Sequence, residues 1–284
     1  MLTNPVRQFL RSARLIIGLC SLLMFAVAPK LQAQSSEEEF DSYKLRVEGF
    51  WLYSHPSGTF HASVDSGSVN LTQDLAFNTY STFAGKLDWK FTHKNHLYVE
   101  AIPFNSSREV VLTRTIVFEG KTFEAGLSVE GNLSAPMYGF GYQYDIIRRR
   151  RGHLGLAVQF NVFNSHASIS AAAQVTGSGV QQQAVSASGS LLAPIPIAGP
   201  EFRFYLTNSP RLFIEGNLNG MYFFGYGNYL SSFSTLRFSV NRHISLNAGY
   251  ALASRLTVKT SSSSDRIGLD MTQRGPLVGE EFSL

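Results

Sequence analysis

The sequence predicts an all-β protein that folds as a closed antiparallel up-and-down transmembrane β-barrel of about ten strands, with eight strands as the alternative. Apolar residues recur at every second position, as in residues 43–53 and 83–91, and charged residues stand between them. A period of two places successive side chains on opposite faces of a sheet. The segments also form mirror-symmetric pairs about short turns, and an export signal precedes them. These observations favour strands with one face toward a membrane and the other toward a polar interior.

Residues 1–33 have the features of a secretory signal peptide. Arg7, Arg11 and Arg14 give a positively charged start, and an apolar run follows from residue 15 to residue 28. This run is shorter than the ~20 residues that a membrane-spanning helix needs. Ala33 offers a small residue at the cleavage site. We therefore expect a signal peptide over 1–33, an acidic periplasmic lead-in over 34–42 and an outer-membrane β-barrel over 43–284.

The charge balance of the mature chain argues against nucleic acid as a partner. The whole sequence holds 24 Lys and Arg residues against 20 Asp and Glu residues. Four of the basic residues and none of the acidic ones lie in the signal segment, so the mature chain is balanced. Such a chain has no general basic excess to attract a phosphate backbone. The single cysteine, Cys20, also lies in the signal segment, which leaves no disulfide or thiolate chemistry to the mature chain.

Five hairpins follow one another along the mature chain. The three long ones cover residues 45–91, 96–147 and 154–204, with turn centres at 66–68, 120–121 and 177–179, and two shorter ones turn at 225–227 and 261–264. In the second hairpin Pro103 and Pro136 lie almost opposite each other, which predicts one irregular level of the sheet because proline cannot donate to the ladder. Short polar links join the hairpins, so both termini are predicted on the short-turn, periplasmic side.

The arms of the long hairpins exceed what a membrane requires. Each arm has about 22 residues, whereas a membrane-spanning strand needs about 9–11. We therefore expect extended extracellular hairpins that form a collar of sheet above the membrane. For residues 165–190, which are rich in Ser, Ala, Gln and Gly and contain no Asp, Glu, Lys or Arg, a flexible loop is an equal alternative.

Alternation assigns the charged residues of the strands to the barrel interior. The outward positions carry large apolar side chains such as Trp51, Phe83 and Leu218. Charges inside a protein must be paired or hydrated, and the inward positions hold both signs in near-equal number. We predict a structural ion-pair network in the lumen made by Arg46, Glu48, Lys86, Asp88, Lys90, Glu100, Asp145, Glu201, Arg203, Glu215 and Arg237.

A run of four arginines is predicted to form a basic periplasmic turn, made of Arg148, Arg149, Arg150 and Arg151. Two interpretations stay open for this turn. Its side chains contact peptidoglycan or the anionic headgroups of the inner leaflet, or they only keep the end of the sheet solvated.

The chain resembles the small outer-membrane β-barrel proteins, the class that includes the transmembrane domain of OmpA and OmpW. The resemblance rests on the signal peptide, the alternating strands, the polar turns and the last strand, in which Pro276, Val278, Phe282 and Leu284 hold alternate positions. Glu280 departs from that pattern, and Leu284 replaces the usual terminal Phe. The resemblance implies a location in the outer membrane of a Gram-negative-type bacterium, and we expect the protein to be a monomer. Its partners would be outer-membrane lipids, lipopolysaccharide and the barrel assembly machinery, which would read the C-terminal strand.

One pair of residues matches the catalytic pair of lipid A deacylases of this class. These enzymes use a His-x-Ser pair backed by an acid, and His166 and Ser168 have that spacing. Alternation places both on one face, so the imidazole could act as a base for the hydroxyl. The flanking asparagine of that family is missing, however, and no carboxylate occurs between His166 and Glu201.

Two further kinds of site were considered. Omptin proteases need acids and an Asp/His couple at the outer rim, and the chain offers only couples from separate strands, such as His61 with Asp74. The other acids at the predicted rim are Asp65, Glu109, Glu119, Glu124, Glu130, Asp265 and Asp270. The seven histidines are scattered singly, and no phosphate-binding loop occurs. We therefore expect no metal and no cofactor.

The sequence thus favours a structural or surface-binding barrel without enzymatic activity. Two alternatives stay open: a narrow pore for small solutes and a lipid A-modifying hydrolase built on His166 and Ser168. A water-soluble barrel or sandwich would be the answer if the ionic face pointed outward, since alternation alone does not say which face meets solvent.

Overall fold

The structure is a computed structural model, and the barrel unit within it runs from Glu39 to Leu284. It describes residue 40, residues 42–61, 69–77, 79–171 and 184–207, residue 209, and residues 211–223, 227–259 and 268–284. The predicted signal peptide and most of the predicted acidic lead-in lie outside these residues. In the part of the chain described, no helix is long and apolar enough to cross a membrane.

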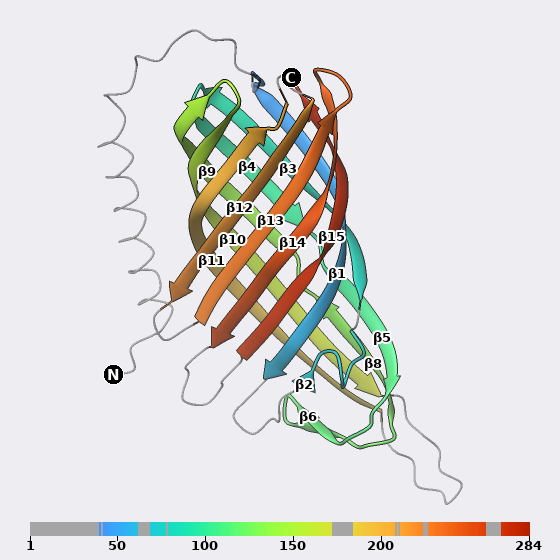
Figure 1. The fold of residues 1–284 in the computed structure, drawn as a ribbon. Coiled ribbons are helices and arrows are strands. Elements are labelled where there is room, and N and C mark those ends of the chain that lie inside the picture. Colours follow the sequence, from blue (N-terminus) through green and yellow to red (C-terminus); the bar gives the residue numbers. More distant parts are fainter. Residues whose placement is uncertain are drawn as a thin grey trace, which may run out of the picture. The chain divides into compact units, whose positions relative to one another are not determined.

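Ten antiparallel strands close into a barrel, which confirms the predicted fold class (Figure 1). Each strand bonds to the next in the order β1, β3, β4, β9, β10, β11, β12, β13, β14, β15, and β15 returns to β1. Their bounds are β1 Leu45–His61, β3 Tyr80–Thr92, β4 Asn95–Ile102, β9 Met137–Arg149, β10 Gly152–Ala171, β11 Val185–Tyr205, β12 Leu212–Phe223, β13 Gly227–Ser239, β14 Ile244–Lys259 and β15 Gly268–Ser283.

The register of the hairpins follows the mirror symmetry of the sequence. Leu45 pairs with Trp89, and Gly152 pairs with Phe204. The midpoints of these pairs are positions 67 and 178, which are the predicted turn centres. Lys44 donates its backbone N–H to the carbonyl of Leu284 at 2.6 Å, so the first and last residues of the barrel sequence meet. They meet at the end of the barrel that carries the short turns, here called the short-turn end (Figure 1).

The two prolines mark an irregular level, as predicted. Strand β4 stops at Ile102, and its arm resumes as β5 (Asn105–Val111) beyond Pro103. The returning arm is likewise divided into β8 (Ser128–Ser134) and β9, with Pro136 between them. Pairing continues beyond this level, away from the short turns, between β5 and β8. Strand β8 also pairs with the part of β10 that lies farthest from the short turns. The collar therefore consists of β5, β8 and the parts of β10 and β11 farthest from the short turns. We call this end of the barrel the long-hairpin end.

The first hairpin differs from the expected symmetrical collar. Its second arm joins the barrel only at Tyr80, because residues 71–75 form a turn that packs inside the long-hairpin end. The short strand β2 (Val69–Asn70) leads into that turn from β1. Asn70 holds the turn locally, since its side-chain oxygen accepts the N–H groups of Thr72 at 3.0 Å and Gln73 at 2.8 Å. Alternation did not reveal this inward fold, which depends on contacts with distant strands.

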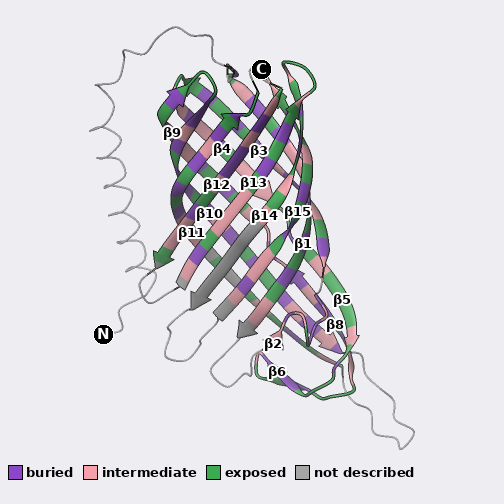
Figure 2. Ribbon diagram, viewed as in Figure 1, coloured by how far each residue is buried: buried purple, intermediate pink, exposed green. Residues whose placement is uncertain are grey.

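The ionic face of the sheet lies inside the barrel and the apolar face lies outside. Buried and exposed positions alternate along most strands (Figure 2). Arg46 and Asp88 are 2% and 1% exposed, whereas Phe83 and Leu218 are 58% and 50% exposed. A water-soluble shell with a greasy interior would show the reverse arrangement. An outer face this rich in large apolar side chains is suited to hydrocarbon.

Candidate functional site

Side-chain ion pairs fill the short-turn half of the lumen. Arg46 of β1 lies at their centre: its Nε is 3.1 Å from Glu48, and its two terminal nitrogens are 2.8 Å from Asp88 and 3.2 Å from Glu215. All four side chains are almost fully buried. Each arginine in a low-dielectric interior needs such partners, because an unpaired buried charge is strongly destabilising.

Two more arginines connect the same carboxylates. Arg237 of β13 is 2.5 Å from Glu48 and 2.5 Å from Glu281. Arg203 of β11 donates through Nε to Glu215 at 2.7 Å and is 3.1 Å from Glu281. Three arginines and three glutamates from β1, β11, β12, β13 and β15 therefore form one connected cluster, which we call the arginine–glutamate cluster.

A second group of charges extends the arginine–glutamate cluster toward the short turns. His96 of β4 lies between Asp88, 3.3 Å from Nδ1, and Asp145, 3.2 Å from Nε2. Tyr43 donates its hydroxyl to Asp88 at 2.8 Å. Lys90 lies over the ring of Tyr43, with 5.0 Å from its Nζ to the ring centroid. The lumen at this level is thus occupied by bonded side chains.

The predicted basic turn needs a correction at Arg148. Strand β9 runs on to Arg149, which turns the Arg148 side chain into the lumen, where it is 2.6 Å from Asp145. Only the three following arginines are exposed. Arg150 lies over the ring of Phe40, and Arg151 donates to the carbonyl of Leu206 at 3.1 Å. A run of identical residues gives no signal of where the strand ends, so the sequence could not separate Arg148 from its neighbours.

The remaining predicted lumen residues line the next level of the lumen, on the side nearer the long-hairpin end. Lys86 is 3.1 Å from Glu201 and lies over the ring of Tyr98. Glu100 accepts a hydrogen bond from Gln159 at 2.9 Å and has no cation within 4 Å among the described residues. The Tyr98 hydroxyl in turn donates to the side-chain amide oxygen Oε1 of Gln159 at 3.1 Å. Polar and ionic side chains therefore reach the middle of the barrel.

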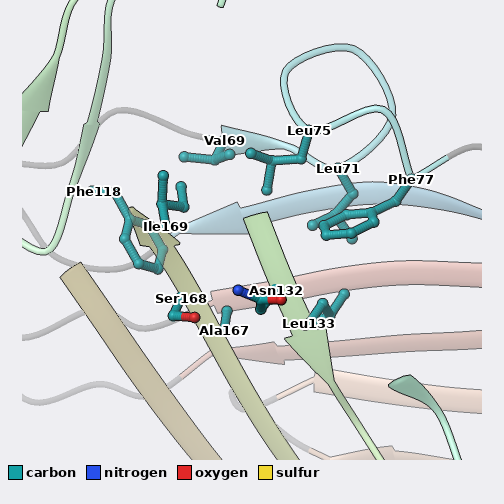
Figure 3. Close-up of a pocket in the computed structure, with 10 residues that line it drawn as sticks. All are labelled: Val69, Leu71, Leu75, Phe77, Phe118, Asn132, Leu133, Ala167, Ser168 and Ile169. Atoms are coloured by element: carbon teal, nitrogen blue, oxygen red, sulfur yellow. The ribbon is translucent and has the colours of Figure 1, made fainter. Parts of the chain in front are cut away.

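An apolar cluster lies in the opposite half of the lumen. Leu71, Leu75 and Phe77 of the inward turn pack toward Leu133 of β8 and Ile169 of β10 (Figure 3). The void between them measures about 10 Å³, at the lower limit of what holds one water molecule. The described side chains of the cluster therefore leave little room for water between them.

A small hairpin completes the apolar cluster. Strands β6 (Ile116–Phe118) and β7 (Lys121–Phe123) meet at Glu119 and Gly120, which both have positive φ, at 50° and 70°. That conformation is typical of a two-residue hairpin turn and is the one that glycine favours. Phe118 and Phe123 are buried in the cluster.

A buried carboxylate ties the inward turn to the loop that leads to the small hairpin. Asp74 accepts hydrogen bonds from Arg114 Nε at 2.8 Å and from the backbone N–H of Asn70 at 2.7 Å. The hydrogen bond to Asp74 raises the pKa of Arg114 above its ordinary value. Asp74 is the acid that a protease-like couple with His61 would use; the side chain of His61 lies outside the described residues. The carboxylate of Asp74 is already engaged by Arg114.

The predicted hydrolase pair is not assembled in the described part of the chain. His166 and Ser168 lie on one face of β10, as alternation predicted, and that face is the outward one. The described residues give His166 no hydrogen bond to Ser168 and no carboxylate partner. Its neighbours across the strands are Ser134 and Ser190. The activity itself stays a prediction.

A cavity of about 140 Å³ lies between the ionic and the apolar halves of the lumen. Its lining on one side includes Glu48, Lys86 and Arg237, and on the other Phe104 and Phe163, so it lies where the two halves meet. Asparagine, glutamine and serine side chains of β10, β12, β13, β14 and β15 complete the wall, namely Gln159, Asn161, Asn217, Asn219, Ser231, Ser232, Asn247 and Gln273. The sequence did not predict this cavity.

No family model matches the chain, and no curated protein matches it. Its fold is similar to that of solved outer-membrane proteins. The outer membrane protease OmpT from Escherichia coli is 12% identical, with 87% of this chain and 100% of that chain covered and a TM-score of 0.54. The transport unit of the autotransporter AIDA-I from Escherichia coli is 10% identical, with 91% and 96% covered and a TM-score of 0.43. Ail of Yersinia pestis, the attachment invasion locus protein, is 10% identical, with 84% and 98% covered and a TM-score of 0.33.

These likenesses concern the fold alone. The chain has the closed antiparallel barrel fold of Gram-negative outer-membrane proteins. Barrels with that fold serve varied roles, and the low identity transfers none of them to this chain.

Proposed function

We propose that this protein is an outer-membrane barrel with a closed lumen, whose role is structural or surface-binding and not the passage of solutes. The observation that carries the proposal is the filling of the lumen at two levels. The arginine–glutamate cluster spans one level with almost fully buried ion pairs. The apolar cluster of the inward turn fills the other. Small barrels are commonly filled by side chains in this way, whereas open aqueous channels need ~16 strands.

In this proposal the short-turn end and both termini lie in the periplasm, and the collar lies outside the cell. The outer wall would contact membrane lipids and lipopolysaccharide, and the barrel assembly machinery would recognise β15. Exposed aromatic residues near the two ends of the wall support a membrane between these ends: Trp51 and Tyr53 lie toward the long-hairpin end, and Trp89 and Phe91 lie toward the short-turn end. Aromatic side chains are enriched at membrane interfaces. We propose a monomer, because each of the ten wall strands is hydrogen-bonded to a neighbouring strand on both sides.

Conductance in planar bilayers tests the closed lumen directly. The purified protein is expected to give no single-channel steps. A variant without the inward turn and small hairpin is also expected to give none, because the ion pairs of the arginine–glutamate cluster remain. Stepwise conductance of the unaltered protein, reproduced in independent preparations, would establish the pore alternative. An open porin reconstituted in the same bilayers serves as the positive control.

Location is tested separately by fractionation. The protein is expected to sediment with outer membranes and to migrate faster on gels before boiling than after it, because a folded barrel resists the detergent. Protease added to intact cells should cleave the collar and spare the short-turn end. Recovery in the soluble periplasmic fraction would overturn the membrane assignment.

A further inference from the structure

We propose that the cavity in the middle of the barrel binds a compact amphipathic molecule that has an apolar body about the size of one benzene ring and a hydroxyl group. The proposal goes beyond a structural or surface-binding role, and it does not depend on whether the lumen conducts.

The size of the cavity sets the size of the ligand. The cavity measures about 140 Å³. An engineered protein cavity of ~150 Å³ with an apolar lining holds benzene. Phe50, Leu52 and Phe163 belong to the lining here, together with Ile102, Ile197 and Leu277. The apolar part of the wall therefore fits a ring or a short hydrocarbon chain.

Polar atoms without partners face the same space. In the described residues, Asn161 Nδ2, Asn219 Oδ1 and both side-chain polar atoms of Asn247 are buried and make no hydrogen bond. The three side chains are 0%, 3% and 6% exposed and line the cavity. Buried polar groups in proteins nearly always have a partner, so these atoms call for one inside the cavity. Water alone suits only the polar part of the wall, because it finds no partners against the apolar part.

The position of the hydroxyl follows from three polar side chains that meet over Gly139. Glu100 and Asn161 are both strand partners of Gly139, one on each side. A Cβ atom at Gly139 would lie 2.3 Å from Gln159 Nε2 and 2.8 Å from Asn161 Oδ1, so the glycine makes the room in which they meet. Gln159 Nε2 donates to Glu100 at 2.9 Å and to Asn161 at 2.6 Å.

This arrangement leaves one acceptor and one donor side by side. Among the described residues, the Glu100 carboxylate accepts a hydrogen bond only from Gln159, and Asn161 Nδ2 has no acceptor. A hydroxyl donates one hydrogen bond and accepts others, so it satisfies both groups at once. An ammonium group could pair with Glu100 but would present a donor to Asn161 Nδ2, which is itself a donor.

The wall beside the cavity has a place where the strands part. The ladder between β11 and β12 ends at the pair Ala198–Gly220. Strand β11 extends beyond this pair, toward the long-hairpin end, as far as Val185. Pro194 and Pro196 lie in this extension and cannot donate to a neighbouring strand. Ile197 and Asn219, which flank the last pair, both line the cavity. An amphipathic molecule would enter here, where the described residues of β11 and β12 form no backbone ladder.

Fluorine NMR of the refolded protein in lipid vesicles tests the proposal with 4-fluorobenzyl alcohol as the probe. Saturable binding is expected, with at least fivefold weaker binding of 4-fluorotoluene and of 4-fluorobenzylamine. Ser231→Phe places a ring in the cavity and should abolish binding, whereas Ser234→Phe on the outward face of the same strand should not. Asn161→Leu should weaken binding of the alcohol about five- to tenfold, with Asn164→Leu as the outward control.

Each outcome decides the proposal once the gel shift on heating shows that a variant is folded. No saturable binding, or binding that Ser231→Phe leaves unchanged, would overturn the site, since the probe would then partition into lipid. Equal binding of the fluorotoluene, with no effect of Asn161→Leu, would overturn the assignment of the hydroxyl. Tighter binding of the benzylamine would replace the hydroxyl by a cationic group and overturn the ligand class stated here.

Discussion

Arg237 and Glu48 are 189 residues apart in the chain, yet their guanidinium and carboxylate groups are 2.5 Å apart in the barrel lumen. The strands that carry them, β13 and β1, are separated in the wall by β14 and β15. The contact therefore crosses the interior and does not follow the sheet. It joins strands from both ends of the chain, which makes its formation dependent on closure of the ring.

Replacement of Arg237 should destabilise the barrel strongly. In Arg237→Met, Glu48 and Glu281 each lose a partner at 2.5 Å, and Glu215 loses one at 3.2 Å. Breaking a buried ion pair on one side costs about 3–5 kcal/mol. The measurement is the free energy of unfolding in urea from lipid vesicles, followed by the gel shift on heating.

Two comparisons give this result its meaning. Arg149→Met removes an exposed arginine and is expected to change the free energy of unfolding by less than ~0.5 kcal/mol. Adding Glu281→Gln to Arg237→Met should restore part of the loss, because one unpaired charge is then removed. Equal stability of Arg237→Met and Arg149→Met would contradict the buried network.

Arg148 and Arg149 should behave differently although they are adjacent in one basic run. Arg148 is buried against Asp145 at 2.6 Å, whereas Arg149 is exposed. Arg148→Ala should lower the free energy of unfolding by about 1–3 kcal/mol, because the buried Asp145 carboxylate loses its arginine partner. Among the described residues, that carboxylate then keeps His96 and Gln143 as partners. Arg149→Ala should leave it unchanged within error. Identical urea midpoints for the two variants would return Arg148 to the solvated turn.

The vertical position of the membrane can be located with two arginine substitutions. Leu218 of β12 and Val111 of β5 are 50% and 57% exposed on the outer surface. Leu218 lies in the ten-stranded wall, whereas Val111 lies in the collar. Arginine on the lipid face near the bilayer centre costs about 2–4 kcal/mol and costs little outside it. Leu218→Arg should therefore destabilise the refolded barrel and Val111→Arg should not; the reverse order would place the collar in the membrane.

The strand pairing could be predicted because it depends on patterns inside each hairpin. The pair Leu45–Trp89 has its midpoint at a turn signal visible in the sequence, and the alternation around it fixes which side chains point inward. Arg46 and Asp88 were therefore assigned to the lumen from the sequence. Their partnership was beyond prediction in detail, since Arg46 also contacts Glu215, which is 169 residues away.

Other members of the ionic lumen had weaker signals. Glu281 lies between the outward residues Glu280 and Phe282, so the register of the last strand places it inward. The signal is weak, because Glu280 itself departs from the apolar pattern of the outward positions. His96 has the parity of an inward residue, yet it begins its strand next to a polar turn and resembles a turn residue. The apolar cluster had no signal of this kind. Leu71 and Phe77 belong to a segment without alternation, and only distant strands give them a place to pack.

The inward turn should loosen without loss of the barrel when Asp74 is replaced. In Asp74→Ala, the backbone N–H of Asn70 and the guanidinium of Arg114 both lose their acceptor. Protease added to intact cells should then cut the first hairpin about tenfold faster, because local opening costs less. Glu124→Ala, which removes an exposed carboxylate, is the control. If Asp74→Ala also abolished the gel shift on heating, the turn would be part of the barrel's global stability and not a separable plug.

His166→Ala should leave the lipid A of the cell unchanged. Catalysis by His166 and Ser168 would require the imidazole to be oriented by a hydrogen-bonded acid and to reach the hydroxyl. The described structure supplies neither contact, and the strand neighbours of His166 are serines. Mass spectrometry of lipid A from cells that express the unaltered protein and the variant at equal levels is the measurement, with empty cells as the baseline. Loss of an acyl chain that depends on the unaltered protein and disappears in His166→Ala would show that the pair assembles in the membrane, and the non-enzymatic role proposed above would then be wrong.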